Sequence, residues 1–108
     1  MRAEIELLEL KHQVTADSFV VVSKEQLSCD LSGEAAILDL KSGVYYGLNE
    51  LGAFIWNNIR EPRRVSQVKD AILEEYEVEP SRCERDLLRL LTQLAAKGLI
   101  EVSDEANS

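Results

Sequence analysis

A strand, a glycine turn, a second strand and a helix follow one another within residues 34–59, EAAILDLKSGVYYGLNELGAFIWNNI. We expect Lys41, Ser42 and Gly43 to form a three-residue loop in which Gly43 takes the left-handed conformation. One face of the hairpin then carries Ala36, Leu38, Leu40, Val44, Tyr46 and Leu48. The opposite face carries Ile37, Asp39, Tyr45 and Gly47. A one-residue slip would move side chains to the wrong face, so the pattern specifies a single register.

The helix that follows this hairpin has a clear start. Asn49 is the expected N-cap, because its side-chain oxygen can accept a hydrogen bond from a backbone N–H of the first turn. The helical spacing predicts a buried stripe of Leu51, Phe54, Ile55 and Ile59. Trp56 lies off that stripe, and we expect it in the core because tryptophan is mostly buried in folded proteins.

Two further helices are expected in the second half of the chain. Ser66 is the predicted N-cap of the first, with Val68, Ile72 and Tyr76 on its inner face. Pro80 suits the first position of the other, and Gly98 suits the position after its end. The buried stripe of this last helix is Cys83, Leu87, Leu90, Leu91 and Leu94.

The order of elements predicts the fold class. A β-branched run at residues 19–22 predicts a strand, with 27–31 as a candidate for its continuation, and residues 99–102 return to the core as a short extended piece. Strands grouped before helices favour an α+β fold, a three-stranded antiparallel sheet followed by three helices, similar to a winged helix-turn-helix. We expect an N-terminal arm at 1–17, one domain at 18–103 and a frayed end at 104–108.

Composition excludes several classes of function. The net charge of −8 disfavours nucleic-acid binding, and no apolar run is long enough to span a membrane. Cys29, Cys83 and the single His12 offer neither metal-ligand spacing nor a nucleophile with a base, so we predict no metal, no cofactor and no enzyme. The two thiols are expected in the core and the imidazole on the surface, in a cytoplasmic protein without a secretory signal.

The strand at residues 44–48 is the expected edge of the sheet, because the chain leaves it for a helix. It contains neither proline nor lysine, two residues that usually protect an edge. An unprotected edge can pair with an extended peptide. The alternative is an edge covered by a second copy of the chain or by the N-terminal arm.

At this point a family resemblance emerges. The block LDLKSGVYYGLNELGAFIW, a helix ending in EEYEVEP and a helix ending in KGLI resemble the small peptide chaperones of pyrroloquinoline quinone biosynthesis. These PqqD-like proteins are leader-peptide recognition elements of ribosomally made, post-translationally modified peptides (RiPPs). Tyr45 and Tyr46 before Leu48 and Asn49 look most like the stand-alone recognition proteins of lasso-peptide clusters. The resemblance covers about residues 19–102.

The resemblance implies a non-catalytic adaptor. Such a protein binds a precursor leader as an added strand, in the groove between its third strand and third helix. It presents the peptide to a transglutaminase-like leader peptidase, and an ATP-dependent cyclase is a further partner. Carried onto this sequence, the predicted leader-binding residues are Val44, Tyr45, Tyr46, Gly47, Leu48, Arg82, Arg85, Asp86, Arg89, Leu90 and Gln93.

Several alternatives remain open. Arg82, Arg85 and Arg89 share a helix face and could anchor acidic leader side chains, or form a solvated face with Asp86 paired to Arg82 or Arg89. Tyr45 could face solvent or contact a partner enzyme. The whole chain could instead be a winged-helix DNA-binding regulator or a self-pairing scaffold subunit.

Overall fold

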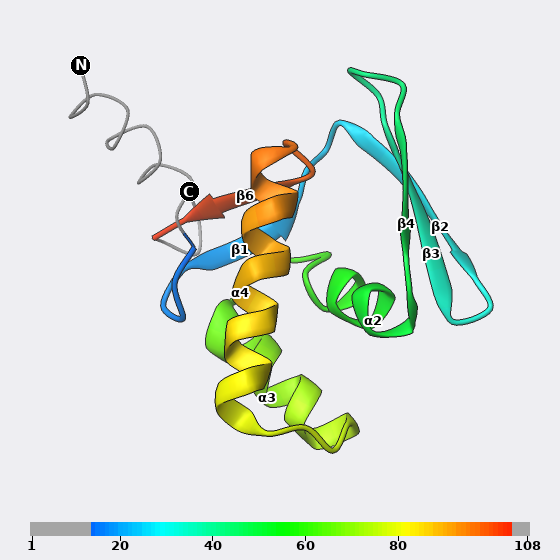
Figure 1. Cartoon of the computed structure of the whole chain (residues 1–108). Coiled ribbons are helices and arrows are strands. Elements are labelled where there is room, and N and C mark those ends of the chain that lie inside the picture. Colours follow the sequence, from blue (N-terminus) through cyan, green and yellow to red (C-terminus); the bar gives the residue numbers. More distant parts are fainter. Residues whose placement is uncertain (1–13, 105–108) are drawn as a thin grey trace.

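The computed structural model describes residues 14–104. The strands are β1 (Phe19–Val22), β2 (Gln26–Leu31), β3 (Glu34–Asp39), β4 (Tyr45–Leu48), β5 (Arg63–Arg64) and β6 (Ile100–Ser103). The helices are α2 (Glu50–Asn58), α3 (Val65–Glu75) and α4 (Pro80–Ala96). Antiparallel strands and three helices within the described residues confirm the predicted α+β class, and a winged-helix description is compatible with it (Figure 1).

The strands form two small sheets. The predicted three-stranded sheet is present in the order β2-β3-β4, and a second sheet has the order β5-β1-β6. The second sheet was not predicted. Strand β1 leaves β2 because it pairs along its whole length with β6, from Phe19 opposite Ser103 to Val22 opposite Ile100. Ser23 continues this pairing, since its N–H donates to the Leu99 carbonyl at 2.9 Å.

The predicted register of the β3-β4 hairpin is wrong by one residue. Ile37 pairs with Tyr46, whereas the sequence pattern had placed Leu38 there. The loop has four residues, because the Asp39 N–H donates to the Val44 carbonyl at 3.0 Å. Gly43 does take the left-handed conformation, with φ of 74°.

Two sets of hydrogen bonds explain the longer loop. The Leu40 N–H still pairs with the Glu25 carbonyl across from β2, at 3.2 Å. The Asp39 carboxylate accepts from the Lys41 N–H at 3.0 Å and the Ser42 hydroxyl at 2.9 Å, which closes the turn. The faces of β3 are therefore exchanged: Ile37 is fully buried, and Leu40 is 52% exposed.

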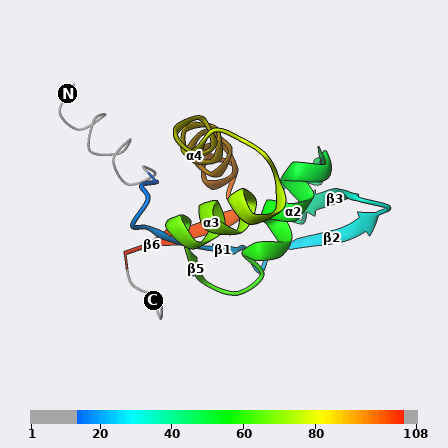
Figure 2. The ribbon, with the colours of Figure 1, turned by 90° about the horizontal axis from the view of Figure 1, so that it is seen from below.

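The core lies among the three helices and both sheets. Helix α2 packs against β3 and β4, and α4 packs against β6, with all three helices on the same side of the β2-β3-β4 sheet (Figures 1 and 2). Asn49 caps α2 as predicted, accepting from the Gly52 N–H at 2.9 Å. Trp56 is in the core as predicted, and its indole N–H donates to Ser28 at 3.2 Å. Leu51, predicted as buried, is instead exposed.

The helix ends follow local chemistry. The predicted cap Ser66 is wrong: α3 begins at Val65, and the N–H of its cap residue Arg64 donates to the Gln67 side chain at 2.9 Å. Pro80 begins α4 as predicted, and Gly98 follows its end with φ of 73°. The predicted inner residues of both helices lie in or against the core, namely Val68, Ile72, Tyr76, Cys83, Leu87, Leu90, Leu91 and Leu94.

The predictions for 1–13 and 105–108, including that for His12, lie outside the described residues. Within the predicted arm, Val14 is buried, and the Ala16 carbonyl accepts from the Ser66 N–H at 3.1 Å. Cys83 is buried as expected, but Cys29 is exposed, because its side chain lies with that of Ala36 on the face of the β2-β3-β4 sheet that points away from the helices. Among residues 14–104, no helix has the length and apolarity to cross a membrane.

Candidate functional site

Strand β4 is an edge strand, as predicted. Its only partner within the described sheet is β3. The backbone bond between Asp39 and Val44 fixes the direction of the others, because hydrogen-bonding groups alternate along an antiparallel strand. Tyr46 and Leu48 therefore direct their backbone groups to β3. Tyr45 and Gly47 direct their N–H and C=O groups to the open edge.

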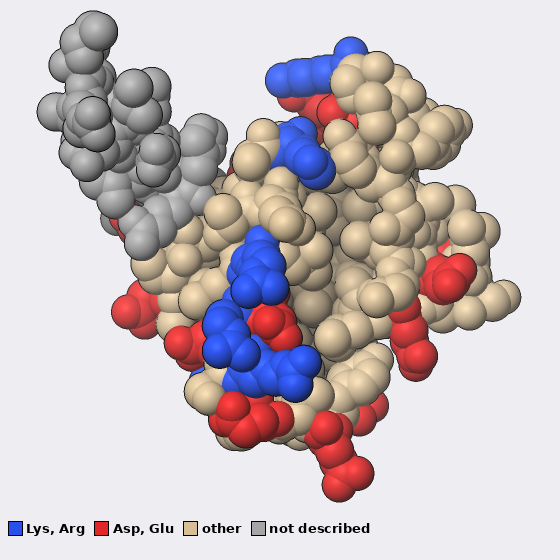
Figure 3. All heavy atoms as spheres, in the orientation of Figure 1, with Lys and Arg blue, Asp and Glu red and all other residues tan. Residues whose placement is uncertain are grey.

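A groove lies beside this edge, between β4, α2 and α4. Its volume is about 800 Å³. The buried side chains of Ile55, Ile72, Cys83 and Leu87 form its floor, and Leu48 and Leu90 form parts of its walls. Figure 3 shows a hollow beside the basic side chains along α4, with a largely uncharged surface across from them. The groove therefore offers an apolar interior next to backbone groups available for pairing.

The structure brings only some of the predicted site residues together. Those that line the groove are Gly47, Leu48, Arg82, Asp86 and Leu90. Tyr46 packs against the core, and the Lys97 ammonium lies 5.6 Å from its ring centroid. The remaining ones are on the surface outside the groove: Val44, Tyr45, Arg85, Arg89 and Gln93. Val44 precedes β4, and Tyr45 points to the opposite face of the sheet with 72% exposure.

Sequence reasoning missed the residues at the α2 end of the groove. Leu51 and Val78 line it and are 37% and 41% exposed. Gly52 lets α2 approach β4 closely, because a Cβ there would lie only 3.2 Å from Leu48 Cβ and 3.3 Å from Asn49 Oδ1. An apolar residue in the first turn of a helix, two positions after its cap, as Leu51 is, was the available signal.

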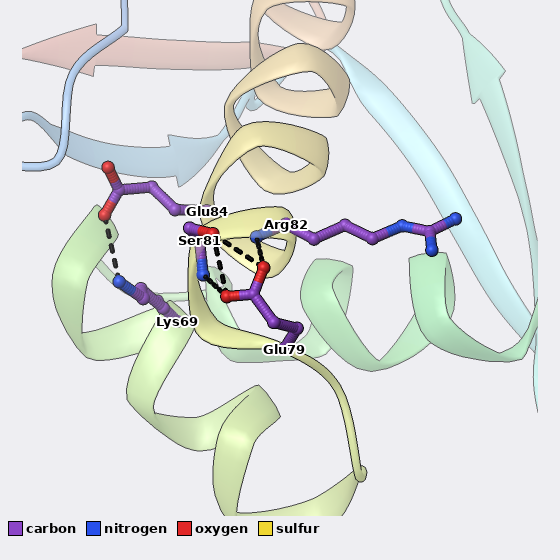
Figure 4. A network of polar contacts seen from close by, with 5 residues as sticks. All are labelled: Lys69, Glu79, Ser81, Arg82 and Glu84. Carbon is purple, nitrogen blue, oxygen red and sulfur yellow. Dashed lines mark hydrogen bonds and ion pairs between the residues drawn. The ribbon is translucent and has the colours of Figure 1, made fainter.

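Arg82 is the one basic residue among those that line the groove, where it stands beside Asp86 of α4 and the acidic residues Glu77 and Glu79. The Arg82 side chain extends from α4 towards α2 (Figure 4), and its Nε lies 3.7 Å from Asp86 Oδ2. Both side chains are more than half exposed, so this pair is weak and leaves Arg82 available for a ligand carboxylate. Lys69 and Glu84 pair at 3.1 Å, away from the groove residues.

Two titratable groups near the groove have shifted pKa values. Hydrogen bonds from Ser81 and from the Arg82 N–H lower the pKa of Glu79, the N-cap of α4. Burial raises the pKa of the Cys83 thiol, which keeps it protonated at the groove floor. Within the part of the chain that the structure describes, no group of His, Cys, Asp and Glu side chains could hold a metal ion.

Comparisons with known proteins agree on one family. The family model described as coenzyme PQQ synthesis protein D (PqqD) matches residues 34–100. None of the curated protein sequences that were compared matches the chain significantly.

Three solved structures have related folds. TbiB1 in complex with the TbiA(beta) leader peptide is 37% identical, with a TM-score of 0.71 over 75% of this chain and 94% of that chain. Lasso peptide synthetase B1 complexed with the leader peptide is 28% identical, with a TM-score of 0.68 over 76% and 96%. The tRNA-dependent lantibiotic dehydratase MibB from Microbispora sp. 107891 shares the fold alone, with 15% identity, a TM-score of 0.56 and coverage of 94% and 10%.

Proposed function

The chain belongs to the PqqD family, and we propose that it binds the leader of a precursor peptide as a strand added to the free edge of β4. One observation carries the proposal: Gly47, whose backbone groups face the open edge of β4, lines the groove between β4 and α4. Two similar proteins, TbiB1 and lasso peptide synthetase B1, have been solved with leader peptides, which supports the same ligand here.

The geometry defines how such a leader would bind. Main-chain hydrogen bonds to Tyr45 and Gly47 would supply affinity that does not depend on sequence. Side chains alternate across a strand, so every second leader residue would point to the side of the sheet on which Tyr46 and Leu48 lie. Apolar leader side chains would fill the space between Leu48 and Leu90 in the groove.

Charge adds a second element of recognition. Arg82 lines the groove, and Arg89 lies two turns further along α4. A leader with acidic side chains towards α4 would meet these guanidinium groups, which bind carboxylates with charge-assisted hydrogen bonds. Arg85, Asp86 and Gln93 complete the α4 residues that we assign to leader binding.

In this proposal the chain is a non-catalytic adaptor of lasso-peptide biosynthesis. It presents the bound precursor to a transglutaminase-like leader peptidase, and the ATP-dependent cyclase acts as a further partner. Its similarity to lasso peptide synthetase B1 over most of both chains supports this pathway. No observation favours the DNA-binding alternative, because the acidic net charge opposes it.

Titration of a fluorescently labelled leader of the cognate precursor peptide tests the proposal by anisotropy. We expect saturable binding with a Kd of about 10 µM or tighter, in the range of peptide-docking domains. A leader of the same composition in scrambled order is the control. Absence of binding at roughly 50 µM protein would refute the proposal.

A further inference from the structure

The β2-β3-β4 sheet has an outer face that no described helix or strand covers. All three helices lie on its other side (Figures 1 and 2). The strand pairing directs these large side chains outwards: Leu27, Leu31, Leu38, Leu40 and Tyr45. Four of them are exposed to between 52% and 72%. We call this surface the outer face.

Large and small side chains lie in separate rows on the outer face. Cross-strand partners Leu27, Leu38 and Tyr45 form one row of large side chains, which we call the ridge. The next row on the same face consists of Cys29, Ala36 and Gly47, which we call the channel. Neither row contains a charged side chain. The register places two acidic residues on this face, Glu34 beyond the channel and Glu25, the cross-strand partner of Leu40, beyond the ridge.

The ridge of one copy of the chain is complementary in shape to the channel of a second copy. A twofold axis parallel to the rows, midway between ridge and channel, would place the ridge of each copy over the channel of the other. Such isologous contacts are usual in homodimers, and sheets pack face to face about 10 Å apart with interdigitated side chains. The uncharged rows are also where two chains of net charge −8 could approach with little repulsion.

The exposed area sets the strength of such a contact. A large side chain exposes on the order of 100–250 Å² when free. The outer face therefore offers on the order of 500 Å² of apolar surface, which is large for a monomer and below the roughly 800 Å² per partner of a standard interface. This area fits a dimer that dissociates in the micromolar range.

We propose that two copies of this chain associate through their outer faces, ridge into channel, in a reversible homodimer. The open backbone groups of β4 lie at the edge of the sheet and not on its face, so each copy keeps its groove accessible. The dimer therefore carries two leader sites. This contact differs from pairing of the β4 edges, which would occupy those sites.

Sedimentation velocity of the full chain between about 1 and 200 µM tests the proposal, since a micromolar dimer dissociates within that range. We expect a shift from the mass of the 12.2 kDa chain towards twice that mass. Leu27→Asp removes an exposed ridge side chain and adds a charge, and Ala36→Phe fills the channel. Each should weaken association by roughly a hundredfold, as loss of a central contact does. Val78→Asp, an exposed apolar residue on another surface, is the matched control.

Cys29 provides an independent readout, because it lies in the channel and is exposed, whereas Cys83 is buried. A short bis-maleimide should join two copies through Cys29, and Leu27→Asp should abolish the product in dilute protein. Leader anisotropy with Leu27→Asp separates this proposal from the proposed function, because leader affinity should stay unchanged. A monomer at all concentrations overturns the dimer, and so does a dimer that both outer-face variants leave intact. A monomer that dimerises only after removal of residues 1–13 would assign the outer face to that segment instead.

Discussion

Gly47 offers the sharpest test of strand addition, because its backbone N–H points to the open edge of β4. Replacement by proline removes that donor without breaking a bond to β3, and proline is tolerated where an edge N–H faces solvent. A Cβ at position 47 would meet no atom within 4 Å, so the new ring has room in the free protein. Gly47→Pro should therefore fold and lose leader affinity selectively.

The magnitude follows from the one lost hydrogen bond. Its loss, with the leader carbonyl left unpaired beside the groove, costs about 1.5–3 kcal/mol. This corresponds to a roughly 10- to 150-fold higher Kd in the anisotropy titration. Gly47→Ala keeps the N–H and is the matched control, expected within about threefold of the unchanged protein because surface substitutions rarely exceed 0.5 kcal/mol.

A stability measurement completes the design. Tyr46→Pro should destabilise the fold by about 2 kcal/mol or more in urea unfolding, because its N–H is directed to Ile37 of β3. Gly47→Pro should unfold close to the unchanged protein. Equal leader affinity of Gly47→Pro and Gly47→Ala, both folded, would refute docking at this edge.

Three further predictions concern charge, packing and pH. Arg82→Glu should weaken leader binding about three- to tenfold at low salt and less at high salt, because Arg82 lines the groove, while Lys24→Glu, outside the groove, should not; no salt dependence would contradict a charged contact. Trp56→Phe should lower the free energy of unfolding by about 1 kcal/mol, since it removes the hydrogen bond to Ser28, and Trp56→Ala by about 3–5 kcal/mol in urea titrations. Folding lowers the pKa of Glu79, so its carboxylate stabilises the protein above the unfolded-state pKa, and this contribution disappears as pH falls through the folded-state pKa. Glu79→Gln should therefore be less stable at neutral pH and equally stable in strong acid, as thermal unfolding across pH can check.

Local signals in the sequence were enough for most elements. Asn49, Pro80 and Gly98 mark their helix ends because caps and breakers act through their own backbone and side chain. The Ser66 prediction failed because a contact between distant segments decided where α3 begins. Arg64 gains its cap from Gln67 while β5 pairs with β1, and that pairing is not visible in the local sequence.

The candidate site was predicted in part. The edge position of β4 followed from the order of elements, and the family resemblance selected α4 as the other wall. Leu51 and Val78 were missed because the helical pattern of α2 made Leu51 a core residue, and nothing local places the α3–α4 loop beside α2.

By itself, the sequence determined the α+β class, the three helices of the described chain, the glycine turn at Gly43 and the PqqD family. These depend on residue types and spacings within a short stretch. Only the tertiary structure decided the hairpin register, the second sheet and the faces of β3. The physical reason is that these features depend on bonds between distant segments. The pairing of Leu40 with Glu25 outweighed the local pattern of the hairpin and placed Ile37 in the core. The pairing of β1 with β6 formed the second sheet. The outer face of the β2-β3-β4 sheet was left uncovered by the described helices.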